Sequence, residues 1–278
     1  MAVINYEPLG STDVTTTKTL LHESIPLTGT IVSGTYGTFP NEDNIKNYTH
    51  GMFQSVYDYP YLSSSANHIF DLTVGFNTSS TLAVAGGVVD FGCVQKSKKQ
   101  NMYTQFAQVL LGYTGSVNTV RDFELDLSLD AAGVMKQAFF INFSRLLYKD
   151  EIKKGTFSIM LGTGSWATPF ALTKSLTDAS ASAAGGGTTN TLGGDYGLLY
   201  DSSLKDDSVQ GVVFYQAGIV VLNTGSFGAI PDFNDSFDVT GSLVSASISG
   251  SCSAMRHRIK NISSVSYTHL RAHETVLD

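Results

Sequence analysis

The sequence predicts a mainly β protein with a minor α component, in which antiparallel sheets form a sandwich-like core with one or two short helices and long polar loops. The first observation is composition, since 13 Tyr and 16 Phe accompany many Thr, Val and Ile residues while only 15% of residues are charged. Such side chains suit pleated, half-buried strands. The second is the alternation of apolar and polar residues in several short segments. The third is the glycine, serine and threonine clusters between those segments, which are typical of turns.

The N-terminal part of the chain contains the first expected strands. Residues 14–37 are rich in Thr, Val and Ile and are interrupted by glycine, which predicts one or two strands. We interpret residues 1–35 as an extended N-terminal arm that packs on a neighbour. Residues 36–264 are then a β-rich structural domain that is incomplete at its C-terminus, and the length suits one large domain or two small ones with a sizeable core.

The next strand is expected at residues 68–76. The segment alternates apolar and polar residues, and Ile69, Leu72 and Val74 fall near one face. This pattern predicts a strand that is buried on one face only.

Residues 101–113 are the best helical segment of the chain. Met102, Phe106, Val109 and Leu110 recur at helical spacing, and Gly112 stands where a C-terminal cap would fall. A helix ending near Gly112 is therefore expected.

Residues 136–164 predict a hairpin-like pair of strands. Phe139, Ile141 and Phe143 alternate with other residues in the first strand, a charged connection ends at Gly155, and a second strand begins just after it.

The remaining segments predict one long loop and three further strands. Residues 175–197 are almost all small or polar, which is typical of a long mobile loop. Residues 211–225 predict two apolar strands joined by a turn at Gln216–Gly218 and placed centrally in a sheet. Residues 242–261 alternate apolar residues with serine and predict another strand.

Charge and hydropathy limit the partners of the chain. The net charge of −7 is opposite to what a nucleic-acid-binding surface needs, because that surface must neutralise phosphates. The basic runs at Lys96–Lys99 and Arg256–Lys260 are short, and we interpret them as solvated loop faces. The chain has neither an N-terminal signal-peptide pattern nor an apolar run of about 18 residues, so no membrane partner is expected. Cys93 and Cys252 are interpreted as small core residues without a disulfide framework.

Motifs for metals and nucleotides are incomplete. The segment that begins at His22 starts like a zinc-protease motif, but Pro26 occupies the second histidine position. Residues 185–194 contain glycines without the spacing of a dinucleotide-binding or phosphate-binding loop. Residues 232–243 begin like a calcium loop, but Phe237 stands where the sharp turn needs glycine.

Catalytic arrangements are incomplete as well. The chain has no GxSxG motif, and Trp166 is expected in the core or at an interface. Asp122, Glu124 and Asp126 alternate with apolar residues, which is typical of an amphipathic strand with a wetted face. The histidines of the first third are scattered: His22, His50 and His68. We assign no catalytic, cofactor-binding or metal-binding residue and expect the protein not to be an enzyme.

Four residues near the C-terminus have the residue types of a zinc site. His269 and His273 are separated by three residues, and Cys252 and His257 precede them. A structural zinc site takes close pairs of Cys or His ligands at each end of a small fold, and the Cys–His spacing here is unusual for that arrangement. We therefore assign no zinc site.

The segment that contains the two last histidines resembles something other than a protein module. Residues 265–275, VSYTHLRAHET, resemble one reading frame of a transposase adapter used to prepare sequencing libraries. We accordingly expect residues 265–278 to be adapter read-through from shotgun-assembled, metagenomic DNA, with the natural reading frame cut short at about Ser264.

Several longer strings resemble a family of virion structural proteins from marine tailed phages, chiefly T4-like phages of cyanobacteria. The strings are FFINFSRLLYKDEIKKGTFSIMLGTG, MYTQFAQVLLG, GDYGLLYDSS, GVVFYQAGIVVLNTG and SGSCSAMRHRIKNIS. The resemblance implies a component of a phage particle, made in the cytoplasm of the host bacterium, whose partners are other virion proteins and copies of itself. It implies no activity or cofactor. Members of the family continue well past the last string, so the resemblance also implies a missing C-terminal portion.

The sequence thus predicts a structural subunit of a tailed-phage virion, with tail or baseplate association favoured. The alternative is a carbohydrate-directed phage protein, either a receptor-binding module or a depolymerase, because abundant aromatic residues permit stacking on sugar rings. A bacterial cytoplasmic enzyme has little support, since no catalytic motif is complete.

Overall fold

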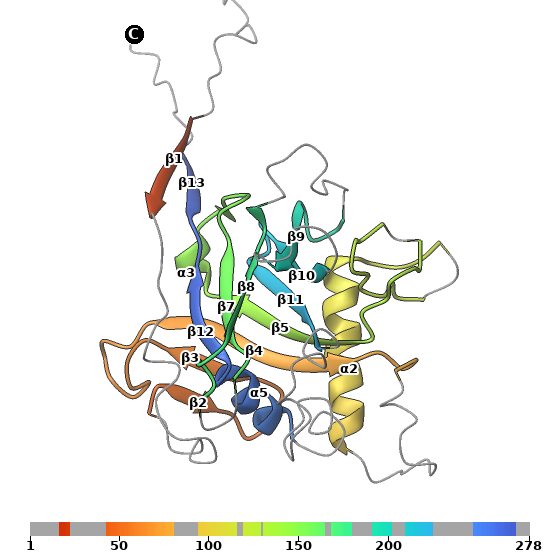
Figure 1. Ribbon diagram of the computed structural model, residues 1–278, viewed down its shortest axis with the longest axis horizontal. Helices are drawn as coiled ribbons and strands as arrows, with labels where there is room; N and C mark the ends of the chain where they lie inside the picture. Colours follow the sequence, from red (N-terminus) through yellow and green to blue (C-terminus); the bar gives the residue numbers. More distant parts are fainter. Residues whose placement is uncertain are drawn as a thin grey trace, which may run out of the picture.

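The computed structural model describes nine ranges of the chain, and a single antiparallel sheet dominates them. The ranges are residues 17–22, 43–80, 94–115, 119–128, 130–164, 168–179, 191–201, 209–224 and 247–270. Within them lie a ten-stranded sheet, a three-stranded sheet and three helices. The mainly β, antiparallel fold with a minor helical component is therefore confirmed (Figure 1).

Every pair of neighbours in the large sheet is antiparallel. Its strands follow in spatial order: β12 (Ile259–Ser263), β7 (Ser158–Gly162), β8 (Thr173–Thr177), β9 (Tyr196–Asp201), β10 (Val209–Phe214), β11 (Ile219–Asn223), β5 (Gln137–Phe143), β4 (His68–Phe76), β3 (Gln54–Tyr57) and β2 (Ile45–Asn47). The small sheet has the order β1 (Thr17–His22), β13 (Ser266–Leu270) and β6 (Glu151–Ile152). The helices are α2 (Val94–Leu110), α3 (Arg145–Tyr148) and α5 (Ile248–Arg256).

The large sheet curls so that its two ends face each other. In Figure 1, β12, β7 and β8 cross in front of β4 and β5. Ile159 and Leu161 of β7 share one buried cluster with Phe70 and Leu72 of β4, and α5 contributes Met255 to it. The sandwich-like core thus comes from one sheet folded over itself, with α5 enclosed near β4.

A second core lies on the opposite face of the sheet. Helix α2 packs there with residues 119–128 and 130–136, and this cluster includes Tyr103, Phe123, Phe140 and Phe214. Because both faces are covered, the half-buried strand expected at residues 68–76 is wrong in one respect. Strand β4 has the predicted bounds, but it is buried on both faces.

Helix α2 is held unusually close to β4. A Cβ atom on Gly75 would lie 2.7 Å from the Lys99 carbonyl oxygen and 2.9 Å from Cβ of Tyr103, so only glycine allows this approach. At the other end, Gly112 has φ +76° and its N–H donates to the Ala107 carbonyl, which confirms the predicted C-terminal cap. The helix begins earlier than expected, at Val94.

The predicted hairpin at residues 136–164 is wrong. Both strands exist as β5 and β7, but four other strands separate them in the sheet. Strand β5 pairs instead with β4 over seven residues and with β11 over five. Both edges of β5 are therefore paired, and its side chains enter the cores on both faces of the sheet, with Phe139 in one cluster and Phe140 in the other.

The serine-rich segment near the C-terminus is also different from the expected strand. Residues 248–256 form α5, and the Ser247 side chain caps it by accepting a hydrogen bond of 3.0 Å from the Gly250 N–H. Ile248, Cys252 and Met255 recur at i, i+4 and i+7 and are all buried. The strand of this region comes later, as β12, and residues 242–246 lie outside the described ranges.

Two other predictions have mixed outcomes. The strands expected around Gln216–Gly218 are confirmed as β10 and β11, in the middle of the sheet. The loop expected over residues 175–197 is too long, because its ends belong to β8 and β9, and residues 180–190 lie outside the described part. In the ranges that the structure describes, no helix is long and apolar enough to span a membrane.

The small sheet joins the N-terminal and C-terminal ends of the described chain. Strand β1, within the predicted arm, pairs antiparallel with β13 from Thr17 to His22. Strand β13 lies in the residues that resemble adapter sequence, and the adapter origin of these residues stays a prediction.

Candidate functional site

The residues with the types of a zinc site are not brought together. Cys252 lies in α5 and His257 directly follows it, while His269 lies in β13 and His273 is outside the described ranges. No group of three or more His, Cys, Asp or Glu side chains suited to a metal occurs in the described residues.

Cys252 and His257 are also poor ligands in their surroundings. Burial raises the pKa of the Cys252 thiol, although the charges of Arg256 and Lys99 act in the opposite direction. The thiol donates a hydrogen bond to the Leu72 carbonyl oxygen, which lies 3.3 Å from Sγ. Burial lowers the pKa of His257 to about 3, and the charges of Arg256 and Arg258 add to this. At neutral pH the protein interior therefore holds a protonated thiol and a neutral imidazole.

The prediction that the two basic runs are solvated loop faces is wrong for Lys99, Arg256 and Arg258, whereas Lys260 is exposed. Lys99 lies inside α2 and is fully buried, and Arg256 and Arg258 are fully buried at the end of α5. Arg258 donates from Nη1 to the carbonyl oxygens of Gly162 and Gly164 at the end of β7. These cations therefore act within the fold.

The acidic triplet does not line one face of a strand, so that prediction is wrong too. Residues 119–128 run across the α2 side of the sheet and pair with other segments through isolated β-bridges. Glu124 is buried and accepts a hydrogen bond of 2.8 Å from the Ala131 N–H. Burial raises the pKa of Asp122, and the neighbouring charge of Glu124 adds to the effect. Asp126 is exposed. The other candidate positions, Cys93, Trp166 and residues 232–243, lie outside the described ranges.

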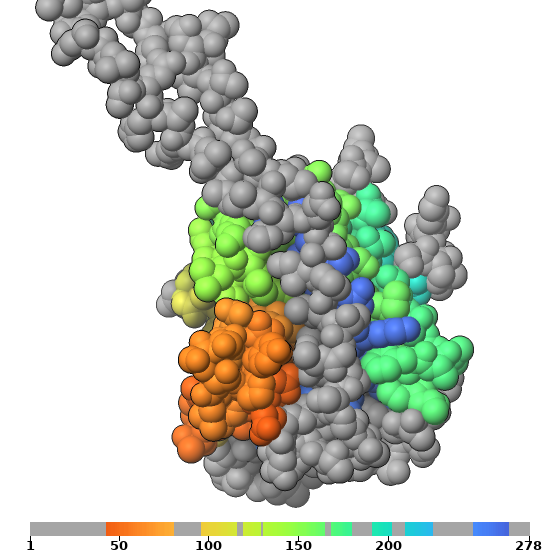
Figure 2. Space-filling model, turned by 90° about the vertical axis from the view of Figure 1, so that its left-hand side faces the viewer, coloured from red at the N-terminus to blue at the C-terminus, as the bar shows by residue number. Residues whose placement is uncertain are grey.

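Two surface features remain as candidate functional sites, and the first is the loop Asp58–Asn67 between β3 and β4. We call it the contact loop. Three apolar or aromatic side chains are exposed on it: Leu62 is 87% exposed, Tyr59 61% and Tyr61 37%. Figure 2 shows the face of the molecule formed by residues 43–80, in orange.

Hydrogen bonds brace the contact loop at its base. The Asn67 N–H and side-chain amide donate to the two carboxylate oxygens of Asp58 at 2.6 and 2.8 Å. Burial tends to raise the pKa of Asp58, but these bonds outweigh it and hold the pKa below its usual range. The Tyr61 N–H donates to the Asp43 carbonyl at 2.8 Å, which anchors the middle of the loop.

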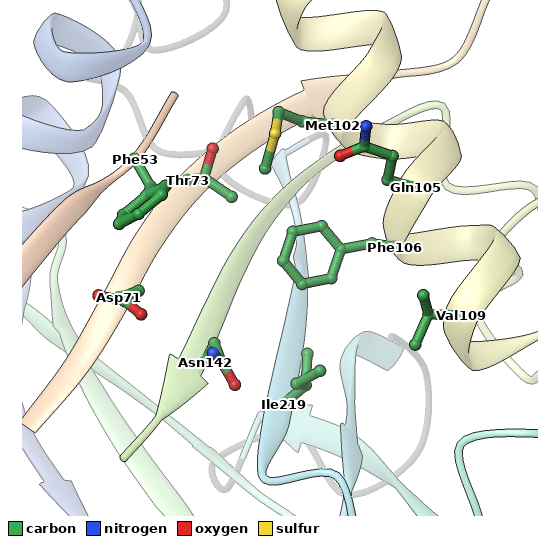
Figure 3. A pocket seen from close by; sticks show the side chains of 9 residues that line it. All are labelled: Phe53, Asp71, Thr73, Met102, Gln105, Phe106, Val109, Asn142 and Ile219. Carbon is green, nitrogen blue, oxygen red and sulfur yellow. The ribbon is translucent and has the colours of Figure 1, made fainter. Parts of the chain in front are cut away.

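The second feature is an open groove between α2 and the sheet, with a volume of about 300 Å³. Nine residues line it, and Figure 3 shows them: Phe53, Asp71, Thr73, Met102, Gln105, Phe106, Val109, Asn142 and Ile219. We call it the α2 groove. Its volume is at the lower end of the range of small-ligand sites, about 300–1,000 Å³.

The α2 groove exists because α2 covers only part of its sheet face. Phe106 stacks on Phe140 with ring centroids 4.3 Å apart and planes 6° apart. Two residues further along β5, Asn142 is only half-buried, and its register partners are Asp71 on β4 and Ile219 on β11. These three side chains form a row beside Phe106 (Figure 3).

Sequence reasoning missed both features. The predicted helix included Phe106, and Asp71 lay inside a predicted strand, but the register that places Asp71 next to Asn142 was not available from either segment alone. Tyr59 and Tyr61, which precede a predicted strand, were the one sequence signal that could have indicated the contact loop.

Comparison with known proteins adds no relative. No protein-family model, curated protein or solved structure matches this chain.

Proposed function

We propose that the chain is a structural subunit of a tailed-phage virion that acts through protein–protein contacts, with association to the tail or baseplate. Its partners are other virion proteins and copies of itself. Support for the phage assignment comes from the family strings of the sequence, which now fall on β5, β7, β9, β10, β11, α2 and α5. These elements build the core of the fold.

The contact loop is the observation that carries the assembly role. Tyrosine side chains supply much of the binding energy of protein interfaces when they enter pockets of a partner, and an exposed leucine adds apolar area that is removed from water on association. Leu62 and Tyr59 are exposed on a loop that Asp58, Asn67 and Asp43 hold in place. A loop ordered before binding loses less conformational entropy in a complex.

Mass spectrometry of purified virions tests the assignment. In particles of a phage that encodes this chain, peptides from residues 43–264 should appear in constant proportion to the major head and tail proteins. Particles that lack these peptides would refute the proposal.

Site-specific photo-crosslinking in the same particles tests the role of the contact loop. A photoreactive side chain at Leu62 should give a discrete cross-link to another virion protein or to a second copy. Leu146 on α3 is a matched control, because it is 73% exposed and lies outside the contact loop. Equal cross-linking from both positions would contradict a specific role for the loop.

A further inference from the structure

The α2 groove combines an aromatic ring with polar groups that have bonding capacity to spare. Among the described residues, Asp71 bonds through Oδ1 alone, which accepts a bond of 2.5 Å from Ser55 and lies 2.9 Å from Nε2 of His68. Within the described part of the chain, Oδ2 of Asp71 and the amides of Asn142 and Gln105 make no hydrogen bond. A carboxylate oxygen and two amides, which both donate and accept, therefore border the groove.

The apolar part of the groove offers a flat surface next to these groups. Phe106 uses one ring face to stack on the buried Phe140, and its ring also lines the groove, with Val109 and Ile219 beside it. In Figure 3, Phe106 projects from α2 toward the row of Asp71 and Asn142. Aromatic ring faces carry negative charge and attract polarised C–H groups.

We propose that the α2 groove is a saccharide-binding site, in which the C–H face of a pyranose ring lies on Phe106 and its hydroxyl groups bond to Asp71, Asn142 and Gln105. A hydroxyl group both donates and accepts. It can donate to Oδ2 of Asp71, accept from the Asn142 amide, and offer a second contact to Gln105. This site goes beyond the structural role and does not depend on it.

Other ligand classes match the groove less well. A phosphorylated ligand needs cations, yet the nine lining residues include no Lys, Arg or His and do include the carboxylate of Asp71. A purely apolar ligand would remove water from Asp71 and Asn142 without replacing their hydrogen bonds, which costs binding energy. A polyhydroxylated ring satisfies both the polar row and the aromatic surface.

The site is suited to binding rather than to cleavage of the glycosidic bond. Glycoside hydrolysis generally uses two carboxyl groups on either side of the scissile bond. Asp71 is the single carboxylate among the nine residues that line the groove.

Saturation-transfer NMR with the full chain tests the proposal. The probes are methyl pyranosides of glucose, galactose, mannose and N-acetylglucosamine, and a glycan array extends the panel to oligosaccharides. At least one pyranoside should receive saturation at its ring C–H protons. Titration of the protein with that pyranoside then gives the dissociation constant of the complex.

Three variants locate the binding. Asp71→Asn and Asn142→Ala should each weaken binding about tenfold, the effect of one lost hydrogen bond to a charged or buried group. Gln105→Ala should weaken it about threefold and, being exposed on a helix, should fold normally. Thr104→Ala is the matched control, since Thr104 is exposed on α2 but does not line this groove.

Each outcome decides the question. Binding that falls in the folded Asp71→Asn and Gln105→Ala variants but not in Thr104→Ala supports the site, whatever the stability of Asn142→Ala. The absence of pyranoside and glycan binding overturns it, as does binding that none of the variants weakens or binding of peptides alone. The virion assignment is decided separately, by the composition of purified particles.

Discussion

The buried imidazole of His257 leads to a specific prediction about acid stability. Its pKa is lowered from the ordinary value of 6.5 to about 3 by burial and by the charges of Arg256 and Arg258. In the unfolded chain the same group regains its ordinary pKa. Between these two values the unfolded chain therefore binds a proton that the folded protein does not, so stability falls as the pH is lowered.

The size of the effect follows from this difference in pKa. Each pH unit between the two values changes the free energy of unfolding by about 1.4 kcal/mol for one proton. The contribution of His257 is fully present above its ordinary pKa of 6.5 and is lost as the pH falls toward 3. From neutral pH to about pH 4.5 the loss amounts to about 2.7 kcal/mol, or roughly two pH units at that slope.

Paired urea denaturation of the wild type and His257→Gln isolates this term. The variant cannot titrate at residue 257, so its stability deficit at neutral pH should shrink by about 2.7 kcal/mol at about pH 4.5. Carboxylates such as Asp122 and Asp178 titrate in both proteins, so their contributions cancel in the difference. Met255→Leu is the control, because it changes a buried residue of α5 without removing a titratable group. A deficit that stays constant with pH for His257→Gln would refute the reasoning.

Three further changes test contacts within the fold. Asp178→Asn should lower the free energy of unfolding by about 1–3 kcal/mol in urea denaturation. Oδ2 of Asp178 accepts hydrogen bonds from both the Gly155 N–H and the Tyr215 hydroxyl, and an amide nitrogen at that position can accept neither; an unchanged midpoint would contradict this. Gly75→Ala should cost at least about 1–3 kcal/mol, seen in the melting temperature, since its Cβ would overlap the backbone of α2, and a neutral effect would show that the helix can move away. In a Cys93→Ser background, Cys252 should react with a thiol reagent only after denaturation, because it is fully buried and burial raises the pKa of its thiol. Rapid labelling of the native protein would refute that burial.

Local patterns were sufficient for the elements with strong periodicity. The bounds of β4 were read directly from the sequence, and the helix end at Gly112 followed from a residue that tolerates positive φ. Strands β10 and β11 were recognised around the turn that ends at Gly218, another glycine with positive φ. In each case neighbouring residues alone carry the signal, since side-chain spacing and turn chemistry are local properties.

The serine-rich segment of α5 shows where local patterns are ambiguous. Its apolar residues fit either a strand with alternating serines or a helix with a buried stripe. The tertiary structure selected the helix, because Cys252 and Met255 then enter the core beside β4 while Ser247 caps the first turn.

Composition and residue spacing were enough to predict the β-rich character, the positions of the most periodic strands and the end of α2. The strand pairing, the burial of Lys99 and Arg258, and the position of Asp71 beside Asn142 in the α2 groove became known from the packed fold. The difference comes from the distance along the chain over which the determining interactions act. Secondary structure depends on residues a few positions apart, whereas pairing and burial depend on which distant segments compete to cover the same apolar surface.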